Sequence, residues 1–340
     1  MEHLQITSFR NKMSEYFEFQ MTKRYLKAGS ISYMGRQQQS FNKNEARDRR
    51  KALIALKDMI GASMNFALKD KSCCTDDDFL NRFLYARKFR CNEAFELIIN
   101  YHSYKQRNKV LLQKLNIFDE TIQMALRDGN PCILKERDRR GRKVILFNTV
   151  NWEPTKYTAE DVYRAFLLTL DKLLEEKQNQ ALGFVVIVDW TNFTLRQSSH
   201  MQPKILKLMI EGLQDCFPAK FKAIHFIAQP WYVDIALAVI KPFLKDKTRE
   251  RFKLHGTNLA TLHECIAKDI LPPDLGGEGP SVNTLDWYHV LLESSQTTEA
   301  PKSYRLIETT VYAKAPFKIP SSNGISEKSQ LMIEANHSNL

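Results

Sequence analysis

Residues 183–188 read Gly-Phe-Val-Val-Ile-Val, a continuous apolar run rich in β-branched side chains. A run of this length without polar alternation is typical of a strand that is buried on both faces of a sheet. Helical patterns precede it at 158–178 and follow it at 203–215, and a further strand is expected at 222–227. Strands that alternate with helices in this way predict an α/β fold, in which helices cover a sheet.

Two more strands are expected before this core, at 132–137 and 143–148. Residues 138–141, Asp-Arg-Arg-Gly, supply the turn between them. The remaining expected elements are helical sequence over 231–251, a short strand at 252–254 and a last helix at 258–267.

A small all-helical domain is predicted ahead of the sheet. From Asn44 onward apolar residues recur at helical spacing, and a second helix is expected to start at the cap residue Thr75 with acids after it. A third is expected over 92–108. The predicted divisions are a flexible extension over 1–43, the helical domain over 44–125, the sheet domain over 126–280 and a mostly flexible C-terminal segment over 281–340.

The balance of charge favours an anionic partner. The 340 residues include 50 Lys and Arg against 39 Asp and Glu, a net charge of +11. Nucleic acid, a membrane surface and a phosphorylated ligand would each suit that surplus. No run approaches the roughly 18 consecutive apolar residues of a membrane-spanning helix, so any membrane contact is expected to be peripheral. The six cysteines have no C-x-x-C spacing and the N-terminus has no signal pattern, which predicts free thiols in a reducing compartment and no zinc site.

No motif in the chain predicts catalysis. The patterns G-x-G-x-x-G, G-x-x-x-x-G-K-[ST], H-E-x-x-H and G-x-S-x-G are all absent. Ser198-Ser199-His200 has no acidic partner in the sequence, His225 lies in an apolar strand, and Asp189 stands alone at the end of a strand. We therefore expect no enzyme activity, no catalytic residue, no metal ligand and no cofactor.

The most unusual stretch is 231–240, Trp-Tyr-Val-Asp-Ile-Ala-Leu-Ala-Val-Ile, in which Asp234 is the only charged residue. A helix that is apolar all round is either covered on both sides or faces lipid on one of them. Cations follow at once: Lys241, Lys245, Lys247, Arg249, Arg251 and Lys253. This combination suits the interface of an anionic membrane. The alternative is a buried core helix followed by a solvated basic helix.

Two pairs of cations indicate a site for a phosphorylated headgroup. Lys247 and Arg251 are four residues apart and would share one face of a helix. Lys220 and Lys222 are two apart at the start of an expected strand, so they also share a face. If the pairs converge, they can donate charge-assisted hydrogen bonds to phosphate oxygens. The alternative is that each pair lies on an ordinary solvated surface.

Ordered motifs link the chain to a known family. Residues 217–227 read Phe-Pro-Ala-Lys-Phe-Lys-Ala-Ile-His-Phe-Ile, 240–244 read Ile-Lys-Pro-Phe-Leu, and 249–256 read Arg-Glu-Arg-Phe-Lys-Leu-His-Gly. Upstream, 79–89 read Phe-Leu-Asn-Arg-Phe-Leu-Tyr-Ala-Arg-Lys-Phe, and 271–277 read Leu-Pro-Pro-Asp-Leu-Gly-Gly. Together these segments resemble the CRAL-TRIO lipid-binding family.

The resemblance covers about residues 45–290. It is stronger for the branch that holds α-tocopherol transfer protein, retinaldehyde-binding protein and the clavesins. Segments 210–217, 229–232 and 240–249 are most similar to the clavesin group.

The resemblance implies a sheet floor covered by helices, and a cavity for one hydrophobic ligand under a mobile gate helix. The residues it implies for a phosphoinositide headgroup are Lys220, Lys222, Lys247, Arg251 and Arg87. The implied lipid pocket consists of Tyr163, Phe166, Leu170, Phe184, Val186, Val188, Leu213, Phe217 and Ile224, for which ordinary core packing is the alternative. The implied gate residues are Trp231, Tyr232, Ile235, Leu237, Val239, Ile240 and Phe243.

The resemblance therefore implies a cytoplasmic, peripheral lipid-binding and transfer protein. It would bind phosphatidylinositol bisphosphate on endosomal, trans-Golgi or vesicle membranes and exchange its ligand there. The alternatives are a phosphoinositide sensor without cargo, a tocopherol or retinoid carrier, and an enzyme acting on the bound lipid. Nucleic acid is not an expected partner, because the cations are not interleaved with exposed aromatics in a recognised module. Residues 331–334, Leu-Met-Ile-Glu, are one residue short of a clathrin-binding box, which puts a clathrin partner in doubt.

Overall fold

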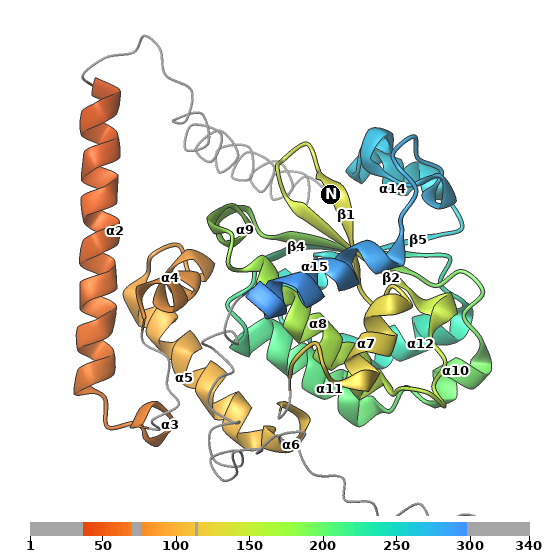
Figure 1. Ribbon diagram of the computed structural model, residues 1–340, viewed down its shortest axis with the longest axis horizontal. Coiled ribbons are helices and arrows are strands. Elements are labelled where there is room, and N and C mark those ends of the chain that lie inside the picture. Colours follow the sequence, from red (N-terminus) through yellow and green to blue (C-terminus); the bar gives the residue numbers. More distant parts are fainter. Residues whose placement is uncertain (1–36, 70–75, 113–114, 298–340) are drawn as a thin grey trace, which may run out of the picture. The chain divides into compact units, whose positions relative to one another are not determined.

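The computed structural model describes residues 37–69, 76–112 and 115–297 (Figure 1). Most of the predicted flexible extension and tail therefore lies outside the described residues. The predicted boundary between the extension and the helical domain lies at Asn44. The first described helix, α2 (Gln37–Ala62), begins earlier, at Gln37. Just after the predicted start of the C-terminal segment at residue 281, the structure has a helix that the sequence does not predict, α15 (Thr284–Thr297).

The first helices pack around aromatic side chains that belong to the main core of the protein. After α2 come α3 (Phe66–Lys69), α4 (Asp77–Ala86), α5 (Cys91–Arg107) and α6 (Lys109–Leu112). The cap of α4 is Asp76, whose side chain accepts a hydrogen bond from Phe79 N at 2.9 Å; the predicted cap, Thr75, lies outside the described residues. Phe79, Phe83 and Tyr101 join α4 to α5, because their ring centroids lie 5.0 to 5.7 Å apart.

A five-stranded sheet follows, in the order β1-β2-β3-β4-β5. Its strands are β1 (Cys132–Arg137), β2 (Lys143–Asn148), β3 (Phe184–Asp189), β4 (Phe221–Ile227) and β5 (Phe252–Gly256). β1 pairs with β2 as an antiparallel hairpin, whereas β2, β3, β4 and β5 are parallel neighbours. The predicted α/β fold is confirmed, and each predicted strand lies within two residues of its observed ends.

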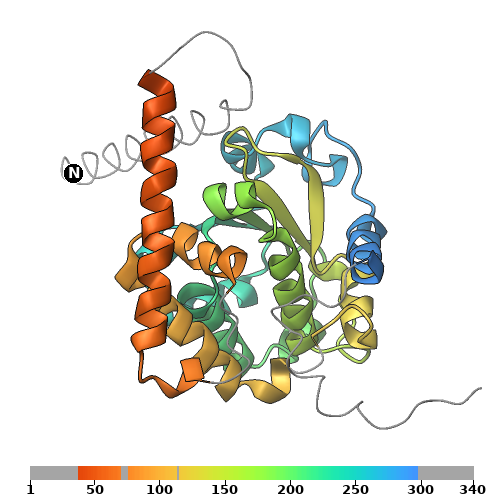
Figure 2. The same ribbon diagram turned by 60° about the vertical axis from the view of Figure 1, so that its left-hand side comes forward.

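Different helices cover the two faces of the sheet (Figures 1 and 2). Phe184 and Val186 of β3 belong to the core beneath α8 (Ala159–Leu173), α11 (Pro203–Glu211) and α12 (Trp231–Ile240). Val185 and Ile187 point the opposite way, toward α14 (Leu259–Cys265) and the turns after it. The remaining elements are α7 (Glu120–Arg127), η1 (Thr149–Asn151), α9 (Lys177–Leu182), α10 (Leu195–Ser199), η2 (Gly212–Cys216), η3 (Lys241–Phe243), α13 (Asp246–Arg249), η4 (Lys268–Ile270) and η5 (Pro273–Leu275).

The long helix predicted over 158–178 is two helices. α8 starts at a capping box, in which the side chains of Thr158 and Asp161 bond each other's backbone N–H. It ends because two side-chain amides donate hydrogen bonds to its last carbonyl groups. Asn179 and Gln180 donate to the backbone oxygens of residues 173 and 174, both at 2.7 Å. The chain can therefore turn and begin α9 before it enters β3.

The helix predicted over 231–251 is also interrupted. Pro242 lacks an N–H, and residues 241–243 form a single turn of 3-10 helix between α12 and α13. Because α13 ends at Arg249, Lys247 and Arg251 do not share one helical face as their spacing predicts.

The predicted tail begins with an ordered helix. α15 lies against α7, α8 and β1 through two aromatic side chains. Trp287 Nε1 donates to Thr169 Oγ1 at 3.0 Å. The guanidinium of Arg127 donates to Tyr288 Oη at 2.9 Å and lies 4.7 Å from the centre of that ring. The segment from residue 281, predicted to be mostly flexible, therefore begins with an ordered helix, and the rest of it lies outside the described residues.

A buried pair of tyrosines joins α5, α8 and α11. Tyr104 Oη donates to Leu208 O at 3.0 Å, so Tyr163 must supply the proton of the 3.0 Å contact between the two hydroxyl oxygens. Burial raises the pKa of both phenols, which keeps them neutral. Here α11 passes into the π-helical turn η2. A Cβ on Gly212 would lie 2.0 Å from Tyr163 Oη, so the turn requires glycine.

We predict that Gly212→Ala lowers the free energy of unfolding by about 1–3 kcal/mol, because the added methyl group displaces the tyrosine pair. Chemical denaturation followed by circular dichroism measures the change. Gly61→Ala in α2 is the matched control, since a Cβ there has no atom within 4 Å and alanine favours a helix. The control should be at least as stable as the wild type. An unchanged denaturation midpoint for Gly212→Ala would contradict the prediction.

Candidate functional site

A cavity of about 1430 Å³ is lined by the sheet and α12, and it extends to side chains on the far face of the sheet such as His225 and Cys265. Its apolar part is lined by Phe147, Phe166, Val186, Val188, Trp190, Phe193, Met201, Leu206, Met209, Ile210, Leu213, Phe221, Ile224, Phe226 and Phe252. The cations that line it are Arg87, Lys88, Arg90, Arg140, Arg142, Lys220, Lys222, Lys245, Lys247, Arg251 and Lys253, and we call this region its basic part. The volume comprises both parts, so two kinds of wall enclose one continuous space.

The helix α12 has two apolar faces in different surroundings. Val233, Ala236, Leu237 and Ile240 line the cavity, at the spacing of one helical face. The other apolar side chains are exposed: Trp231 by 67%, Ile235 by 56% and Val239 by 59%, followed by Phe243 in η3 by 51%. The helix is apolar all round because one face covers the cavity while the other is open to solvent.

Polar contacts hold α12 at its two ends. At the first turn, Tyr232 Oη donates to Phe193 O. Beyond η3, Lys245 forms an ion pair with Asp215, and its backbone N donates to Gln214 Oε1 at 2.9 Å. Between these points Val233 and Leu237 are buried against the core, while Ala236 and Ile240 are only partly buried. Opening the helix would therefore break these apolar contacts as well as the polar contacts at its ends.

All five residues predicted for the headgroup line the cavity: Lys220, Lys222, Lys247, Arg251 and Arg87. Lys220 and Lys222 stand at the start of β4, and Arg251 directly precedes β5, where its carbonyl accepts from Ile224 N at 2.8 Å. β4 and β5 are parallel neighbours, so their amino ends meet at one edge of the sheet. Strand pairing, rather than a shared helical face, brings the two predicted pairs together.

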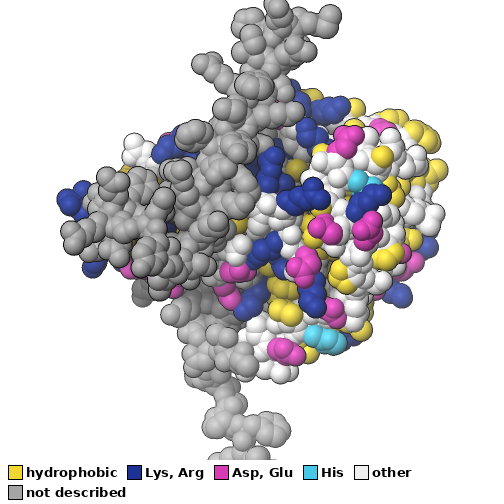
Figure 3. Space-filling model, turned by 90° about the horizontal axis from the view of Figure 1, so that it is seen from above, with side chains coloured by type: hydrophobic (Ala, Val, Ile, Leu, Met, Phe, Trp, Pro, Cys, Tyr) yellow, Lys and Arg dark blue, Asp and Glu magenta, His cyan; other side chains and the backbone are white. Residues whose placement is uncertain are grey.

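The basic part also contains acids and internal contacts. Burial lowers the pKa of Arg87, the residue after α4, while the charges of Glu93 and Asp215 act in the opposite direction. Lys220 Nζ donates to Ala181 O at 2.6 Å. On the face seen in Figure 3, Lys and Arg side chains are interspersed with Asp and Glu. The basic part is thus defined by its place beside the apolar cavity, and not by a uniformly positive surface.

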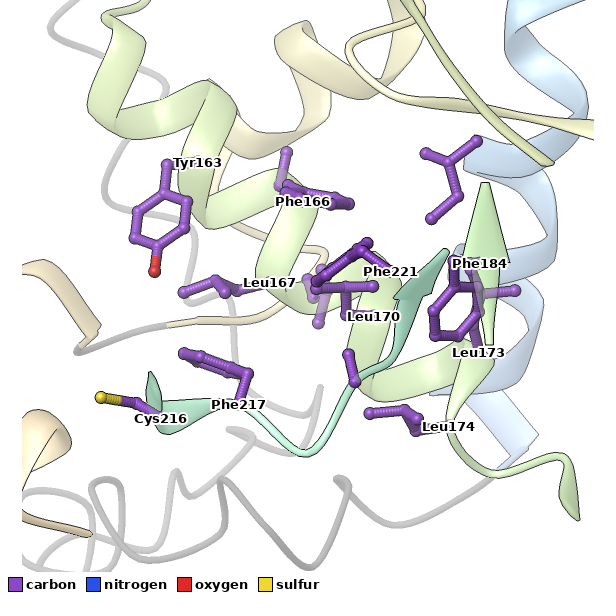
Figure 4. Packing of buried hydrophobic residues seen from close by; sticks show 14 of the residues in the cluster. Tyr163, Phe166, Leu167, Leu170, Leu173, Leu174, Phe184, Cys216, Phe217 and Phe221 are labelled. Atoms are coloured by element: carbon purple, nitrogen blue, oxygen red, sulfur yellow. The ribbon is translucent and has the colours of Figure 1, made fainter. Parts of the chain in front are cut away.

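The predicted lipid-pocket residues divide into two groups. Phe166, Val186, Val188, Leu213 and Ile224 line the cavity. Tyr163, Leu170, Phe184 and Phe217 do not; they are at most 5% exposed and pack in the core shown in Figure 4. In that view Tyr163 projects from α8 toward the side on which Cys216 and Phe217 lie. These four side chains support the cavity from behind.

Other lining residues were not found from the sequence. Val233 and Ala236 share the inner face of α12 with Leu237, a helical periodicity that was available within an otherwise uniform apolar run. Phe226 and Phe252 are neighbours on β4 and β5, and their rings stack at 5.4 Å. Their place in the cavity depends on strand register, which has no local signal.

His225 is a satisfied core histidine, as its apolar strand suggests. Its Nδ1 lies 2.8 Å from His255 Nε2, and His255 Nδ1 lies 2.7 Å from Thr261 Oγ1. Thr261 donates its own proton to Asn258 O at 2.9 Å, so each imidazole in turn donates through Nδ1. Burial, and then the neighbouring His255, lower the pKa of His225 to about 3. Burial also lowers the pKa of His255.

The described residues hold free thiols and no candidate metal site. They contain no group of His, Cys, Asp or Glu that could hold a metal ion. Among them Cys91, Cys132, Cys216 and Cys265 are free thiols, and burial raises the pKa of Cys132 and of Cys216 to about 12. None of the helices in these ranges has both the length and the apolar character needed to cross a bilayer.

Comparison with known proteins places the chain in a family. Residues 127–277 match the family model "CRAL/TRIO domain". Clavesin-1 of Xenopus laevis is 47% identical over 218 residues, 64% of this chain and 66% of the relative. Clavesin-2 of Homo sapiens is 46% identical over 219 residues, 64% and 67% of the two chains. Clavesin-1 of Pongo abelii is 41% identical over 268 residues, 77% of this chain and 74% of the relative.

These matches span about two thirds to three quarters of the relatives' own lengths. Among solved structures, the crystal structure of Sfh5 matches with a TM-score of 0.46 at 14% identity, covering 74% of this chain and 97% of that one.

We predict that titration of His225 makes the protein less stable as the pH falls below 6.5. The pKa is about 3 in the folded protein, against an ordinary value of 6.5, so in that window the unfolded state binds the additional proton. The loss from pH 7 to pH 5.5 should be about 1 kcal/mol. Denaturant titrations at several pH values measure it. His225→Asn should flatten the pH dependence by that amount; an unchanged slope would contradict the prediction.

Proposed function

The chain belongs to the CRAL-TRIO family, and we propose that it is a peripheral lipid-binding and transfer protein with two ligand sites. The apolar part of the cavity holds one hydrophobic ligand, and the basic part binds a phosphoinositide headgroup. α12 is the gate through which the ligand passes to and from a membrane. In this proposal residues 44–125 are the helical domain and residues 126–280 the lipid-binding domain.

The observation that carries the proposal is the cavity. Protein interiors are close-packed, and voids larger than a water molecule are few. A space of about 1430 Å³ exceeds the roughly 300–1,000 Å³ of common small-molecule pockets, and its larger part is lined by aliphatic and aromatic side chains. Such a wall favours a ligand that leaves water for hydrophobic reasons, which is the chemistry of a lipid.

The headgroup site is supported by cations that come from different elements of the fold and line the same cavity. Arg87 follows α4, Lys220 and Lys222 begin β4, Lys247 lies in α13, and Arg251 precedes β5. Cations that the fold gathers at one point disfavour one another's charged forms, and an anion removes that penalty. The phosphates of an inositol bisphosphate offer several acceptor oxygens to such a group of donors.

The gate is supported by the exposure of one apolar face of α12. Trp231, Ile235 and Val239 are each more than half exposed, although a buried core helix would hide them. Exposed apolar side chains beside cations suit the headgroup region of an anionic membrane. Insertion of this face would favour an open position of α12, and ligand would then exchange between cavity and bilayer.

The setting of this activity follows the resemblance to the clavesin group. We place it on endosomal, trans-Golgi or vesicle membranes that face the cytoplasm, in membrane traffic or lipid transport. No enzyme step is part of the proposal. A sensor that binds the headgroup without cargo is the competing function, and the gate experiment below separates the two.

We predict that vesicles containing phosphatidylinositol bisphosphate bind the wild type at least tenfold more tightly than Lys220→Ala/Lys222→Ala/Lys247→Ala/Arg251→Ala. Four charge-assisted contacts to phosphate are lost in that variant. The matched control removes the same charge from exposed cations outside the cavity: Lys135→Ala/Arg139→Ala/Lys177→Ala/Lys268→Ala. Vesicle co-sedimentation with each bisphosphate isomer measures binding. Equal losses in both variants would show that only net charge matters.

We predict that Trp231→Ser/Ile235→Ser/Val239→Ser slows lipid transfer between vesicles by tenfold or more. The variant loses apolar area that inserts into the membrane, while the cavity-facing residues of α12 are unchanged. Retinol and a fluorescent phosphatidylcholine are suitable cargo probes, and headgroup binding should persist. A wild type that binds the headgroup but transfers and retains no lipid is a sensor, and the carrier proposal would then be wrong.

A further inference from the structure

We infer that the outer side of β5 binds an extended acidic segment of a partner protein, which joins the sheet as a further strand. This inference goes beyond lipid binding. It concerns backbone groups of Phe252–Gly256, which neither of the two proposed ligand sites uses.

β5 is the last strand of the sheet, and it is paired on one side. In the part of the chain that the structure describes, its neighbour is β4 and the strand order ends with β5. Arg251 O accepts from Ile224 N at 2.8 Å, and Ile224 lies opposite Phe252 in the register. Because alternate residues of a parallel strand bond to the same neighbour, residues 251, 253 and 255 bond to β4. The backbone N–H and C=O of Phe252 and Leu254 therefore point away from β4.

These outward groups are a template for another strand. Within residues 37–69, 76–112 and 115–297, no hydrogen bond reaches the outward backbone groups of Phe252 and Leu254. Unpaired donors and acceptors along an edge strand can pair with a second chain. Extended peptides are recognised in this way in several protein classes, with affinity from the main chain and specificity from alternate side chains.

The side chains of β5 select a partner with an alternating pattern. Leu254 is 45% exposed and shares a face of the sheet with Phe252, whose ring stacks on Phe226. Lys253 is exposed and projects from the opposite face. The side chains of an added strand would alternate in the same way, so one set packs beside Leu254 and the other meets Lys253. A strand in which apolar and acidic residues alternate fits both faces.

Charge favours an acidic segment over a second copy of this chain. Residues 246–253 contain four cations, Lys247, Arg249, Arg251 and Lys253, against two acids, Asp246 and Glu250. Two β5 strands placed side by side would bring these cations together, and like charges on paired strands are destabilising. Lysine on an edge strand is a common device against such self-pairing. With an acidic partner the same cations become attractive.

The test offers the full-length protein a fluorescent synthetic peptide of alternating glutamate and valine, blocked at both ends. Fluorescence anisotropy measures its binding. The matched probe is the same peptide N-methylated at every residue, which keeps the side chains and the charge but has no backbone N–H. We expect the N-methylated peptide to bind at least about tenfold more weakly, the effect of losing one or more hydrogen bonds.

Leu254→Pro removes one outward N–H and leaves the bonds to β4, because proline is tolerated on an edge strand. Leu254→Ala is its control, since it shortens the side chain and keeps the N–H. We expect the proline variant to bind the peptide about tenfold more weakly than the alanine variant. Leu254 does not line the cavity, so both variants should bind phosphoinositide vesicles as the wild type does, which also shows that they are folded.

Hydrogen exchange followed by NMR reports on the pairing itself. Saturating peptide should slow exchange of the Phe252 and Leu254 amides by at least about tenfold, because those amides become hydrogen-bonded. The amide of Lys253 already bonds to β4, so its exchange should change less.

No binding of the acidic peptide, or equal binding of its N-methylated form, would overturn the inference. Unchanged exchange at Phe252 and Leu254 would do the same. Equal binding of an alternating glutamine and valine peptide would overturn the acidic class. A dimer that protects these amides without peptide would identify the occupant as a second copy, and the inference would be wrong. Each of these results leaves the lipid carrier proposal untouched, since vesicle binding and transfer test it separately.

Discussion

The parallel pairing of β3, β4 and β5 is the constraint on which both parts of the cavity depend. It gathers Lys220 and Arg251 at one edge of the sheet and leaves Trp190 at the other. It also sets which side chains face α12. A shift of β4 by one residue would turn Ile224 and Phe226 away from the cavity. His225 opposes such a shift, because its hydrogen bond to His255 exists only on the far face.

The gate shows how a helix can be well formed and weakly held. Its hydrogen bonds are internal, so α12 needs no tertiary support to satisfy its backbone. On its inner side only Val233 and Leu237 are buried in the core, and its outer side chains meet solvent. The polar contacts that hold it are those of Tyr232 and Lys245 at the ends. Elements with few buried contacts are the ones that open at low free-energy cost.

The sequence predicts the strands well because each is an uninterrupted or bounded apolar run. The cations predicted from the sequence do line the cavity, but one of the reasons for choosing them is mistaken. The helical spacing of Lys247 and Arg251 is irrelevant because the helix is interrupted at Pro242. It cannot separate cavity wall from core, since Phe166 and Phe184 are equally apolar and differ only in what lies in front of them.

A cavity of this size weakens the fold that contains it, because its lining side chains lose dispersion contacts on one side. The rigid joint at Gly212 limits that effect, since the tyrosine pair fixes α11 to α5 and α8 behind the cavity. A bound ligand restores the missing contacts and stabilises the folded state in proportion to the logarithm of its concentration. In the proposed function, a headgroup at the basic part would act on α12 from the other end of the sheet. The two ligands influence each other's affinity only to the extent that each distinguishes the open from the closed position of α12, and that influence is reciprocal.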